Sequence, residues 1–465
     1  MFWKSRRRTR RPVSSCRHHA RPALESLEGR DLLSVSVMEL TDARGAVTGL
    51  SVVANGANDM VTISDNSTTG HTTVVADGRT MDFAQQFPLV DLELMGSRDF
   101  ANFNIVGDYN QRHADLFVDL GTGENHFTFN PGLTAISNHS NFNLDIVGHN
   151  GNDFVNLNFG NILESRVNLT ASNLGGSSTP IGSAAVRDTI TFGTLRAGIR
   201  NSSVDVNVGL GTGNNNLRFN YGSDLGHLAG AGVASDFGPS MFNVNITGSS
   251  RLQDVGNVTL FANGEVNTGS TLNFNTQFIA GNNRFIGVID AAQFQIDDDG
   301  GQFISDVHSG GAAHFNIHAG SGNDLISLAT INQSHTLELS GLLDINIQGG
   351  AGKDNINVDF GGTGGFTDDD PFERRATNRA FRVRVDGGSG ADTINVNAAN
   401  AATATFVYDI AIVGGSKKNG ITFNGNNQGG SPSFGPSGSV FIDGGFGTDS
   451  DVDVSGNFQT EVVNG

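Results

Sequence analysis

A short unit made of a strand, a glycine turn and a second strand recurs along this chain. It is clearest in residues 343–358, which read LDINIQGGAGKDNINV. Leu343, Ile345 and Ile347 alternate with polar residues, so an extended strand places them on one face. The same alternation resumes after the turn. Each unit therefore predicts two strands that meet at a tight corner.

The corner itself has a defined chemistry. Gly349, Gly350 and Gly352 are predicted to adopt the positive φ angles that a sharp turn needs and that other residues avoid. Asp354 closes the turn and can accept hydrogen bonds from the turn's own amides. We use the Asp or Asn at this position as the marker of the repeat.

The markers recur at intervals of about thirty residues. They are Asp59, Asp99, Asn125, Asp153, Asp188, Asn215, Asp254, Asn283, Asp324, Asp354, Asp392, Asn419 and Asp449. The separations run from 26 to 41 residues, and the longer ones resemble the shorter ones with an insertion. At nine markers the second and fourth following residues are both apolar, whereas Asp99, Asp254, Asn283 and Asp449 fit this pattern poorly. Such a period is typical of a protein built from stacked coils.

A third strand per coil is predicted between markers, for example residues 335–339 between 326–328 and 343–347. Three short strands per coil indicate an all-β, right-handed parallel β-helix, or β-solenoid, of about 12–13 coils. An array of two-stranded hairpins is the competing fold, but hairpins favour two-residue turns between equal arms. Phenylalanine, with 32 residues, is predicted to stack from coil to coil inside the core.

The repeat is continuous, so residues 35–465 are predicted to form a single elongated domain. Insertions leave the coils near 175–185, 222–239 and 361–380. Loops on a rigid scaffold often carry binding functions. No apolar stretch approaches the length of a membrane helix.

Residues 1–34 form a separate basic arm, interpreted either as a leader or as a disordered arm. Residues 1–30 hold nine of the 28 basic residues and two of the 47 acidic ones, which leaves the remainder with a net charge of −26. Such an acidic body disfavours nucleic acid as a partner and suits divalent cations. Cys16, the only cysteine, lies in the arm, so the body contains no disulfide.

The end of the arm, RPALESLEGRDLLS, resembles a leader found on many secreted or surface proteins of planctomycete bacteria. The matching residues of its LExLExRxLLS core are Leu24, Glu25, Leu27, Glu28, Arg30, Leu32, Leu33 and Ser34. This resemblance implies export, and hence an extracellular or cell-surface location.

Three turns, GGAGKD at 349–354, GGSGAD at 387–392 and GGFGTD at 444–449, resemble the calcium-binding repeats of RTX proteins. Residues 319–324 and 148–153 are near matches. The resemblance implies calcium bound at Asp324, Asp354, Asp392, Asp449 and Asp153. RTX motifs follow one another every nine residues, however, and a calcium ion needs six to eight oxygens. The alternative is that these aspartates only cap turns, as the Asn markers do.

The predicted function is structural or adhesive, with one polar sheet and the loops presented to carbohydrate, extracellular matrix or other cells. The alternative is a polysaccharide-acting enzyme, a lyase or a hydrolase, since enzymes of this fold gather Asp, Arg and Lys on one sheet. Arg382 and Arg384 alternate on one face before Asp386, and residues 297–299 are three aspartates. No spacing required by a named mechanism is present, so no catalytic residue is predicted. His314 and His318 are expected to be surface residues. The oligomeric state does not follow from the sequence.

Overall fold

The computed structural model describes residues 34–96, 98–131, 135–149, 151–174, 188–225, 239–252, 254–267, 269–290, 295–296, 311–331, 337–339, 341–360, 366–367, 380–398, 407–425, 439–445, 451–456 and 460–463. The chain divides into a unit Met1–Leu33 and a unit Ser34–Gly465. Everything described below belongs to the second unit. The arm before Ser34 and most of the three predicted insertions lie outside the described residues.

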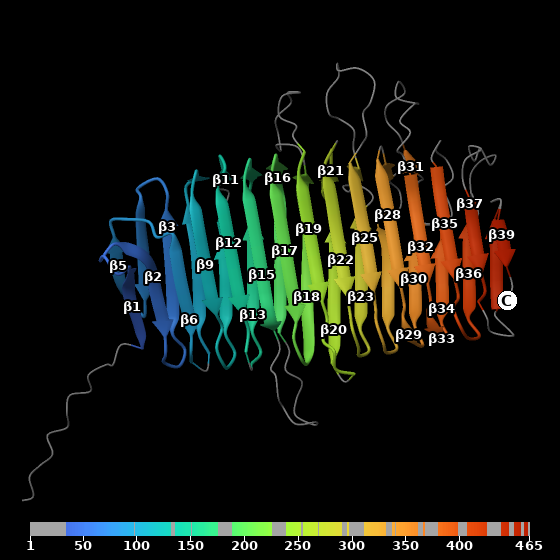
Figure 1. The fold of residues 1–465 in the computed structure, drawn as a ribbon, viewed down its shortest axis with the longest axis horizontal. Helices are drawn as coiled ribbons and strands as arrows, with labels where there is room; N and C mark the ends of the chain where they lie inside the picture. The colour runs from blue at the N-terminus through green and yellow to red at the C-terminus, as the bar shows by residue number, and fades with distance from the viewer. Residues whose placement is uncertain are drawn as a thin grey trace, which may run out of the picture. The chain divides into compact units, whose positions relative to one another are not determined.

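The described residues form strands and no helix, and the predicted all-β class with long parallel sheets is confirmed (Figure 1). One sheet, called sheet A here, has fifteen strands. In order across the sheet they are β1 (Val35–Thr41), β2 (Val47–Ala54), β6 (Leu89–Leu94), β9 (His113–Asp119), β12 (Asn141–Val147), β15 (Arg166–Leu174), β17 (Ser203–Leu210), β19 (Met241–Thr247), β22 (Thr271–Gln277), β25 (Ala312–His318), β28 (Leu342–Gln348), β32 (Ala380–Asp386), β35 (Val407–Val413), β37 (Ser439–Asp443) and β39 (Thr460–Val463). The pair β1 and β2 is antiparallel, and the following pairs are parallel.

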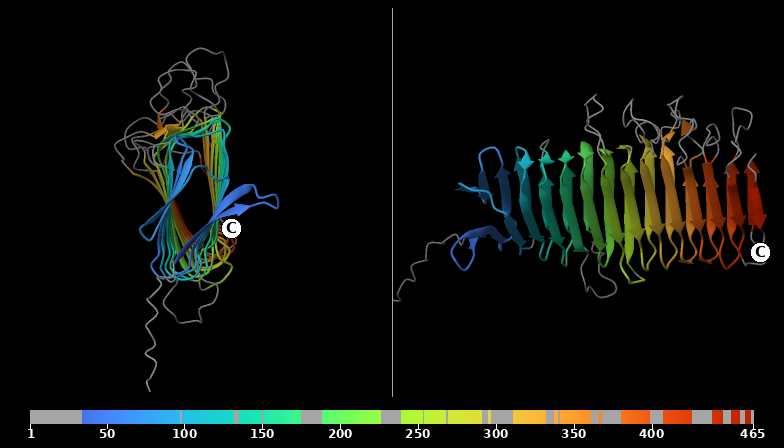
Figure 2. Two further views of the ribbon diagram at one scale, coloured as in Figure 1. Left: turned by 90° about the vertical axis from the view of Figure 1, so that its left-hand side faces the viewer. Right: turned by 45° about the horizontal axis from the view of Figure 1, so that its top comes forward.

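The second sheet, sheet B, faces sheet A across the core (Figure 2). Its main column of parallel strands contains β3 (Met60–Asn66), β7 (Phe100–Val106), β10 (His126–Asn130), β13 (Phe154–Phe159), β16 (Thr189–Arg200), β18 (Asn214–Leu225), β20 (Val255–Ala262), β23 (Arg284–Asp290), β26 (Leu325–Ile331), β30 (Asn355–Asp359), β34 (Thr393–Asn397), β36 (Gly420–Gly425) and β38 (Asp451–Gly456). At its N-terminal edge β4 (His71–Ala76) and β5 (Arg79–Phe83) add antiparallel strands. Successive strands of each sheet therefore come from successive coils.

A column of short strands forms the third side of many coils. It contains β8 (Tyr109–Asn110), β11 (Ile136–Ser137), β14 (Ile162–Leu163), the far ends of β16 and β18, β21 (Glu265–Val266), β24 (Gln295–Ile296), β27 (Leu337–Leu339) and β31 (Phe366–Thr367). The third strand predicted at 335–339 corresponds to β27. Two further short strands, β29 (Ala351–Gly352) and β33 (Ser389–Gly390), pair within the glycine turns.

The core lies between the two sheets and follows the predicted alternation. At all nine markers with the apolar pattern, the second and fourth following residues are at most 2% exposed. Phenylalanine rings stack between coils, as between Phe192 and Phe219, whose centroids lie 4.7 Å apart at an interplanar angle of 4°. Because rings repeat along the axis with no polar atom to satisfy, each coil buries apolar surface against the next.

Asp99, Asp254 and Asn283, which fit the apolar pattern poorly, still precede strands whose inner side chains face the core. Ala101 and Phe103 follow Asp99 and are both buried. Gly256 occupies an inner position after Asp254, where an added Cβ would approach the Phe278 ring to 2.6 Å. A large side chain from a neighbouring coil thus fills the space that a small residue leaves, and hydropathy alone does not reveal this compensation.

Candidate functional site

The markers form a hydrogen-bonded ladder along one corner of the solenoid, which we call the turn ladder. At each step, the side-chain Oδ1 of one marker accepts a hydrogen bond from the backbone N–H of the marker in the preceding coil, at 2.5–3.3 Å. Two runs follow this rule: Asp59, Asp99, Asn125, Asp153, Asp188 and Asn215, and then Asn283, Asp324, Asp354, Asp392 and Asn419. The ladder satisfies one buried amide in every coil of a run except the last, so it ties neighbouring coils together.

The pattern changes at Asp254, between the two runs. Its Oδ2 accepts a hydrogen bond from the Ser249 hydroxyl at 2.6 Å, and its own N–H bonds the carbonyl of Arg251. Asn283 bonds the N–H of Gly256 instead of the marker amide, at 3.0 Å. A local rearrangement of the turn therefore separates the two runs.

Asparagine and aspartate differ in what their second side-chain atom does. The Nδ2 of Asn125 donates to the carbonyl of Leu120 at 2.5 Å, and that of Asn283 donates to the carbonyls of Ala280 and Gly281, both at 3.1 Å. The turn therefore directs carbonyl oxygens at this atom. The corresponding Oδ2 is buried without a hydrogen-bond partner among the described residues at Asp153, Asp324, Asp354 and Asp392. An ionised carboxylate is poorly suited to this environment.

The pKa values of these carboxyls reflect that environment. Burial raises the pKa of Asp153 to about 7 and that of Asp324 to about 7, and it raises the pKa of Asp354 to about 6. The hydrogen bond from the preceding marker's amide lowers these pKa values, whereas the negative charge of the carboxyl in the next coil raises them further. For Asp392, burial is again the main cause of a raised pKa, and Lys417 partly counters it.

The structure thus places four of the five residues implied to bind calcium in the turn ladder. Asp324, Asp354 and Asp392 occupy three consecutive coils, Asp153 stands in the other run, and Asp449 lies outside the described residues. The described residues include no group of three or more His, Cys, Asp or Glu side chains arranged to hold a metal ion. A calcium ion at the ladder would combine a free Oδ2 with backbone carbonyls of the turns, because Oδ1 already accepts an amide.

The glycines of the GGxGxD turns pack backbone against backbone. Gly350 and Gly352 have positive φ angles of 97° and 143°, as predicted. Gly349 does not, and that prediction was wrong. It is a glycine for a different reason, since an added Cβ would lie 2.7 Å from the carbonyl oxygen of Gly387 in the next coil and 2.8 Å from Oδ2 of Asp354. The motif therefore serves close stacking of turns as well as sharp bending.

A second ladder, at the corner before sheet A, was not foreseen. The Oγ of each serine accepts a hydrogen bond from the backbone N–H of the serine in the preceding coil, at 3.1–3.3 Å, along Ser140, Ser165, Ser202, Ser240 and Ser270. A serine directly before the alternating strand, recurring with the period of the repeat, is the sequence signal that identifies it.

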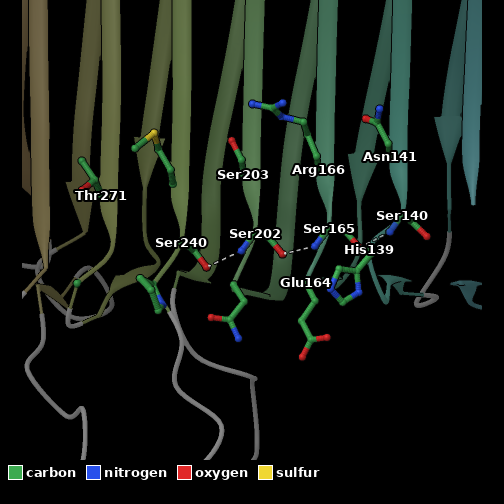
Figure 3. A pocket seen from close by; sticks show the side chains of 14 residues that line it. His139, Ser140, Asn141, Glu164, Ser165, Arg166, Ser202, Ser203, Ser240 and Thr271 are labelled. Atoms are coloured by element: carbon green, nitrogen blue, oxygen red, sulfur yellow. Dashed lines mark hydrogen bonds between the residues drawn. The ribbon is translucent and has the colours of Figure 1, made fainter. Parts of the chain in front are cut away.

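An open groove of about 600 Å³ runs along the serine ladder. Figure 3 shows Glu164 and His139 on one side of the serine row and Arg166 on the other. Glu164 lies 3.7 Å from Arg200, in a partly exposed ion pair. The ladder hydroxyls also donate to backbone carbonyls, as that of Ser202 does to Ile162 at 3.1 Å, so they hold neighbouring coils together.

The outer face of sheet A carries rows of asparagine that run across the strands. In one row Nδ2 of each residue donates to Oδ1 of the preceding one, at 2.8–3.0 Å, along Asn207, Asn245, Asn275 and Asn316. Shorter rows join Asn168 to Asn143, and Asn273 to Asn243. A shallow groove of about 350 Å³ follows the first row as far as Asn346. We call this surface the amide face.

Charged side chains follow one another next to the amide face. His314, Asp344, Arg382 and Asp409 are in register on β25, β28, β32 and β35. Nδ1 of His314 lies 3.3 Å from Asp344, and Arg384 lies 3.4 Å from Asp409. His318 shares this outer face, whereas Asp386 caps its own turn by accepting the N–H of Gly388. Residues 297–299 lie outside the described residues.

No family model, curated protein or solved structure matches the chain. Among the described residues there is also no helix of the length and apolar character required to cross a membrane.

Proposed function

We propose that this chain is a secreted or cell-surface structural and adhesive β-solenoid, coiled in the right-handed sense, that presents its amide face to carbohydrate. The handedness follows from the strong preference for right-handed crossovers between parallel strands. The export step is supported by the leader resemblance of residues 24–34. The observation that carries the adhesive role is the row of Asn207, Asn245, Asn275 and Asn316.

The chemistry of this row suits sugar hydroxyls. Within the row each inner amide uses one N–H and one oxygen lone pair, which leaves a second N–H and a second lone pair for a ligand. A sugar hydroxyl both donates and accepts, so it can pair with such an amide. The strands repeat every 4.8 Å or so, and the polar groups are therefore presented at a regular spacing on a rigid support.

Adhesion predicts that the full chain sediments with an insoluble neutral polysaccharide, either cellulose or chitin. Asn245→Ala together with Asn275→Ala should weaken this binding about tenfold, because each lost hydrogen bond contributes about 0.5–1.5 kcal/mol. The matched control is Asn357→Ala with Asn395→Ala, two amides in register on the outer face of sheet B. Equal loss in both double variants, or binding to neither polymer, would count against the proposal.

The same assay addresses the enzyme alternative. Three adjacent coils place acidic and basic side chains on one face, next to His314. These residues are Asp344, Arg382, Arg384 and Asp409. This arrangement favours a polysaccharide lyase or hydrolase as the second candidate. Release of new reducing ends from cellulose or chitin would support a hydrolase, whereas intact polymer would support adhesion. A lyase needs a uronate-containing chain, so it is assayed on polygalacturonate, where formation of unsaturated chain ends would support it.

Calcium is proposed as a stabilising ion at Asp324, Asp354 and Asp392. An ion that binds only the folded state stabilises it in proportion to the logarithm of its concentration over Kd. We therefore expect the melting temperature of the full chain to rise by several degrees between excess chelator and millimolar calcium, with no rise in magnesium. Asp354→Asn with Asp392→Asn should abolish that rise while retaining Oδ1 for the ladder. An unchanged melting temperature in the original protein would leave the aspartates as turn caps alone.

A further inference from the structure

The outer face of sheet B contains a cleft that neither the turn ladder nor the amide face accounts for. It crosses β16, β18, β20 and β23 and has a volume of about 530 Å³. Arg218 and Arg284 line it, and both are exposed. We call it the arginine cleft.

The strand register fixes how the arginines are placed. Arg218 is in register with Thr259 on β20, whereas Arg284 on β23 is in register with Asn257. The two arginines are thus two strands apart along the solenoid and two residues apart along the strand. With strands about 4.8 Å apart and a rise of about 3.3 Å per residue, their Cα atoms are separated by roughly 12 Å.

The electrostatics of the cleft differ from those of the chain as a whole. Residues 31–465 carry a net charge of −26. Some arginines elsewhere, Arg98, Arg112 and Arg384, have acidic partners, as Arg112 does in Asp65 at 3.1 Å. In contrast, no described carboxylate lies within ion-pair distance of Arg218 or Arg284, and none of the described residues lining the cleft is acidic. Two guanidiniums without carboxylate partners make this hollow complementary to an anion.

Between the arginines the polar part of the lining is made of hydroxyls and amides, next to the apolar side chains of Val255 and Ile286. Arg284 is in register across the sheet with Asn257, Asn216 and Thr189. Arg218 is in register with Thr259. These groups hydrogen-bond to alcohols and add no charge. A ligand that matches the whole cleft has acidic groups separated by hydroxyls. It is also long enough to reach two arginines whose Cα atoms lie about 12 Å apart.

We propose that the arginine cleft binds a carboxylate-bearing polysaccharide, with Arg218 and Arg284 on two of its carboxylates and the Thr and Asn side chains on the hydroxyls between them. The inference takes from the proposed function only the class of ligand, carbohydrate. It places a second, acid-specific site on the sheet opposite the amide face.

Titration of a fluorescently labelled oligogalacturonate with the full chain tests the site. Arg218→Ala with Arg284→Ala should weaken binding tenfold or more, since each substitution removes a charge-assisted contact. It should also flatten the salt dependence of the affinity, because fewer ion pairs form. Arg79→Ala, which removes an exposed arginine from β5, is the matched control and should bind as the original protein does. Unchanged affinity in the double variant would overturn the proposal.

Three further probes define the chemistry. Fully methyl-esterified galacturonan should bind at least tenfold more weakly than the acid form, because the carboxylate charge is gone. Polyglutamate or single-stranded DNA binding as tightly as oligogalacturonate would overturn the assignment to an acidic sugar.

The two carbohydrate sites are separable. Asn245→Ala with Asn275→Ala should leave oligogalacturonate binding intact, and the arginine double variant should leave cellulose or chitin binding intact. Failure of the amide face and failure of the arginine cleft therefore give different results.

Discussion

Replacing Gly352 by alanine is expected to lower the free energy of unfolding by about 3 kcal/mol or more. Gly352 has a φ of 143°, a region that residues with a Cβ rarely adopt. The added methyl group would also overlap the carbonyl oxygen of Gly322 in the preceding coil. Neither backbone can move away without breaking the stack of turns, so strain and overlap add. Urea unfolding of the full chain, followed by circular dichroism, measures the change.

Gly420→Ala provides the matched control. It lies at the start of β36, and no heavy atom lies within 4 Å of an added Cβ. Its φ is outside the positive range, so the substitution should change stability by no more than about 1 kcal/mol in either direction. If both variants unfold at the same urea concentration, the turns do not stack as closely as described.

Replacing Asp324 by asparagine is expected to stabilise the protein at pH 8, by on the order of 2 kcal/mol, and to have little effect at pH 4. The asparagine keeps Oδ1 for the N–H of Asn283, and its Nδ2 can donate to turn carbonyls as Asn125 does. At pH 8 the original carboxyl is ionised beside the ladder carboxyl of Asp354. The substitution removes that buried charge.

The direction of the pH effect follows from proton binding. The pKa of an aspartate is about 3.9 in an unfolded chain, and that of Asp324 is about 7 in the folded protein. Between these values the folded state binds more protons than the unfolded state, so the contribution of this carboxyl to stability is greatest below about pH 4 and is lost as the pH rises through 7. Asp153, also at about 7, and Asp354, at about 6, act in the same direction.

Thermal melts of both proteins from pH 4 to pH 8, in chelator to exclude metal ions, measure this slope. The control is Asp145→Asn, which removes an exposed carboxylate on the outer face of β12. It should leave the slope of the original protein unchanged. A slope that is equally steep in Asp324→Asn would mean that the ladder carboxyl does not titrate in this range.

The coil architecture could be predicted because its signals are local. Alternation within each strand and a polar residue at every corner are properties of consecutive residues, and they identified the inner positions such as Ile356 and Val358. The stations at Asp254 and Asn283 fitted the apolar pattern poorly because Gly256 and Gly287 occupy inner positions, where Phe278 and Leu328 from neighbouring coils approach them.

The candidate site was predicted less completely because its geometry depends on how coils align. The sequence indicated aspartates that cap their own turns. Asp59 and Asp99 do so through Oδ2, which accepts the N–H of Gly56 and Gly96, but their Oδ1 positions could not be foreseen. A hydrogen bond to the preceding coil depends on register between segments some thirty residues apart. The arginine cleft was missed for the same reason, since Arg218 and Arg284 are 66 positions apart in the sequence.

Both side-chain ladders run in one direction along the axis. The Oδ1 of Asp354 completes the hydrogen bonding of Asp324, and the Oγ of Ser202 completes that of Ser165, so a coil is finished only by the coil that follows it. Loss of a following coil leaves two buried amides without their side-chain acceptors, whereas loss of a preceding coil removes no acceptor from the amides of these two ladders. The side-chain hydrogen bonds of the two ladders therefore have a direction: during synthesis each new coil supplies the acceptors for the ladder amides of the coil made before it. The backbone bonds beside them run the other way, since the N–H of Asn355 donates to the carbonyl of Asp324 in the preceding coil.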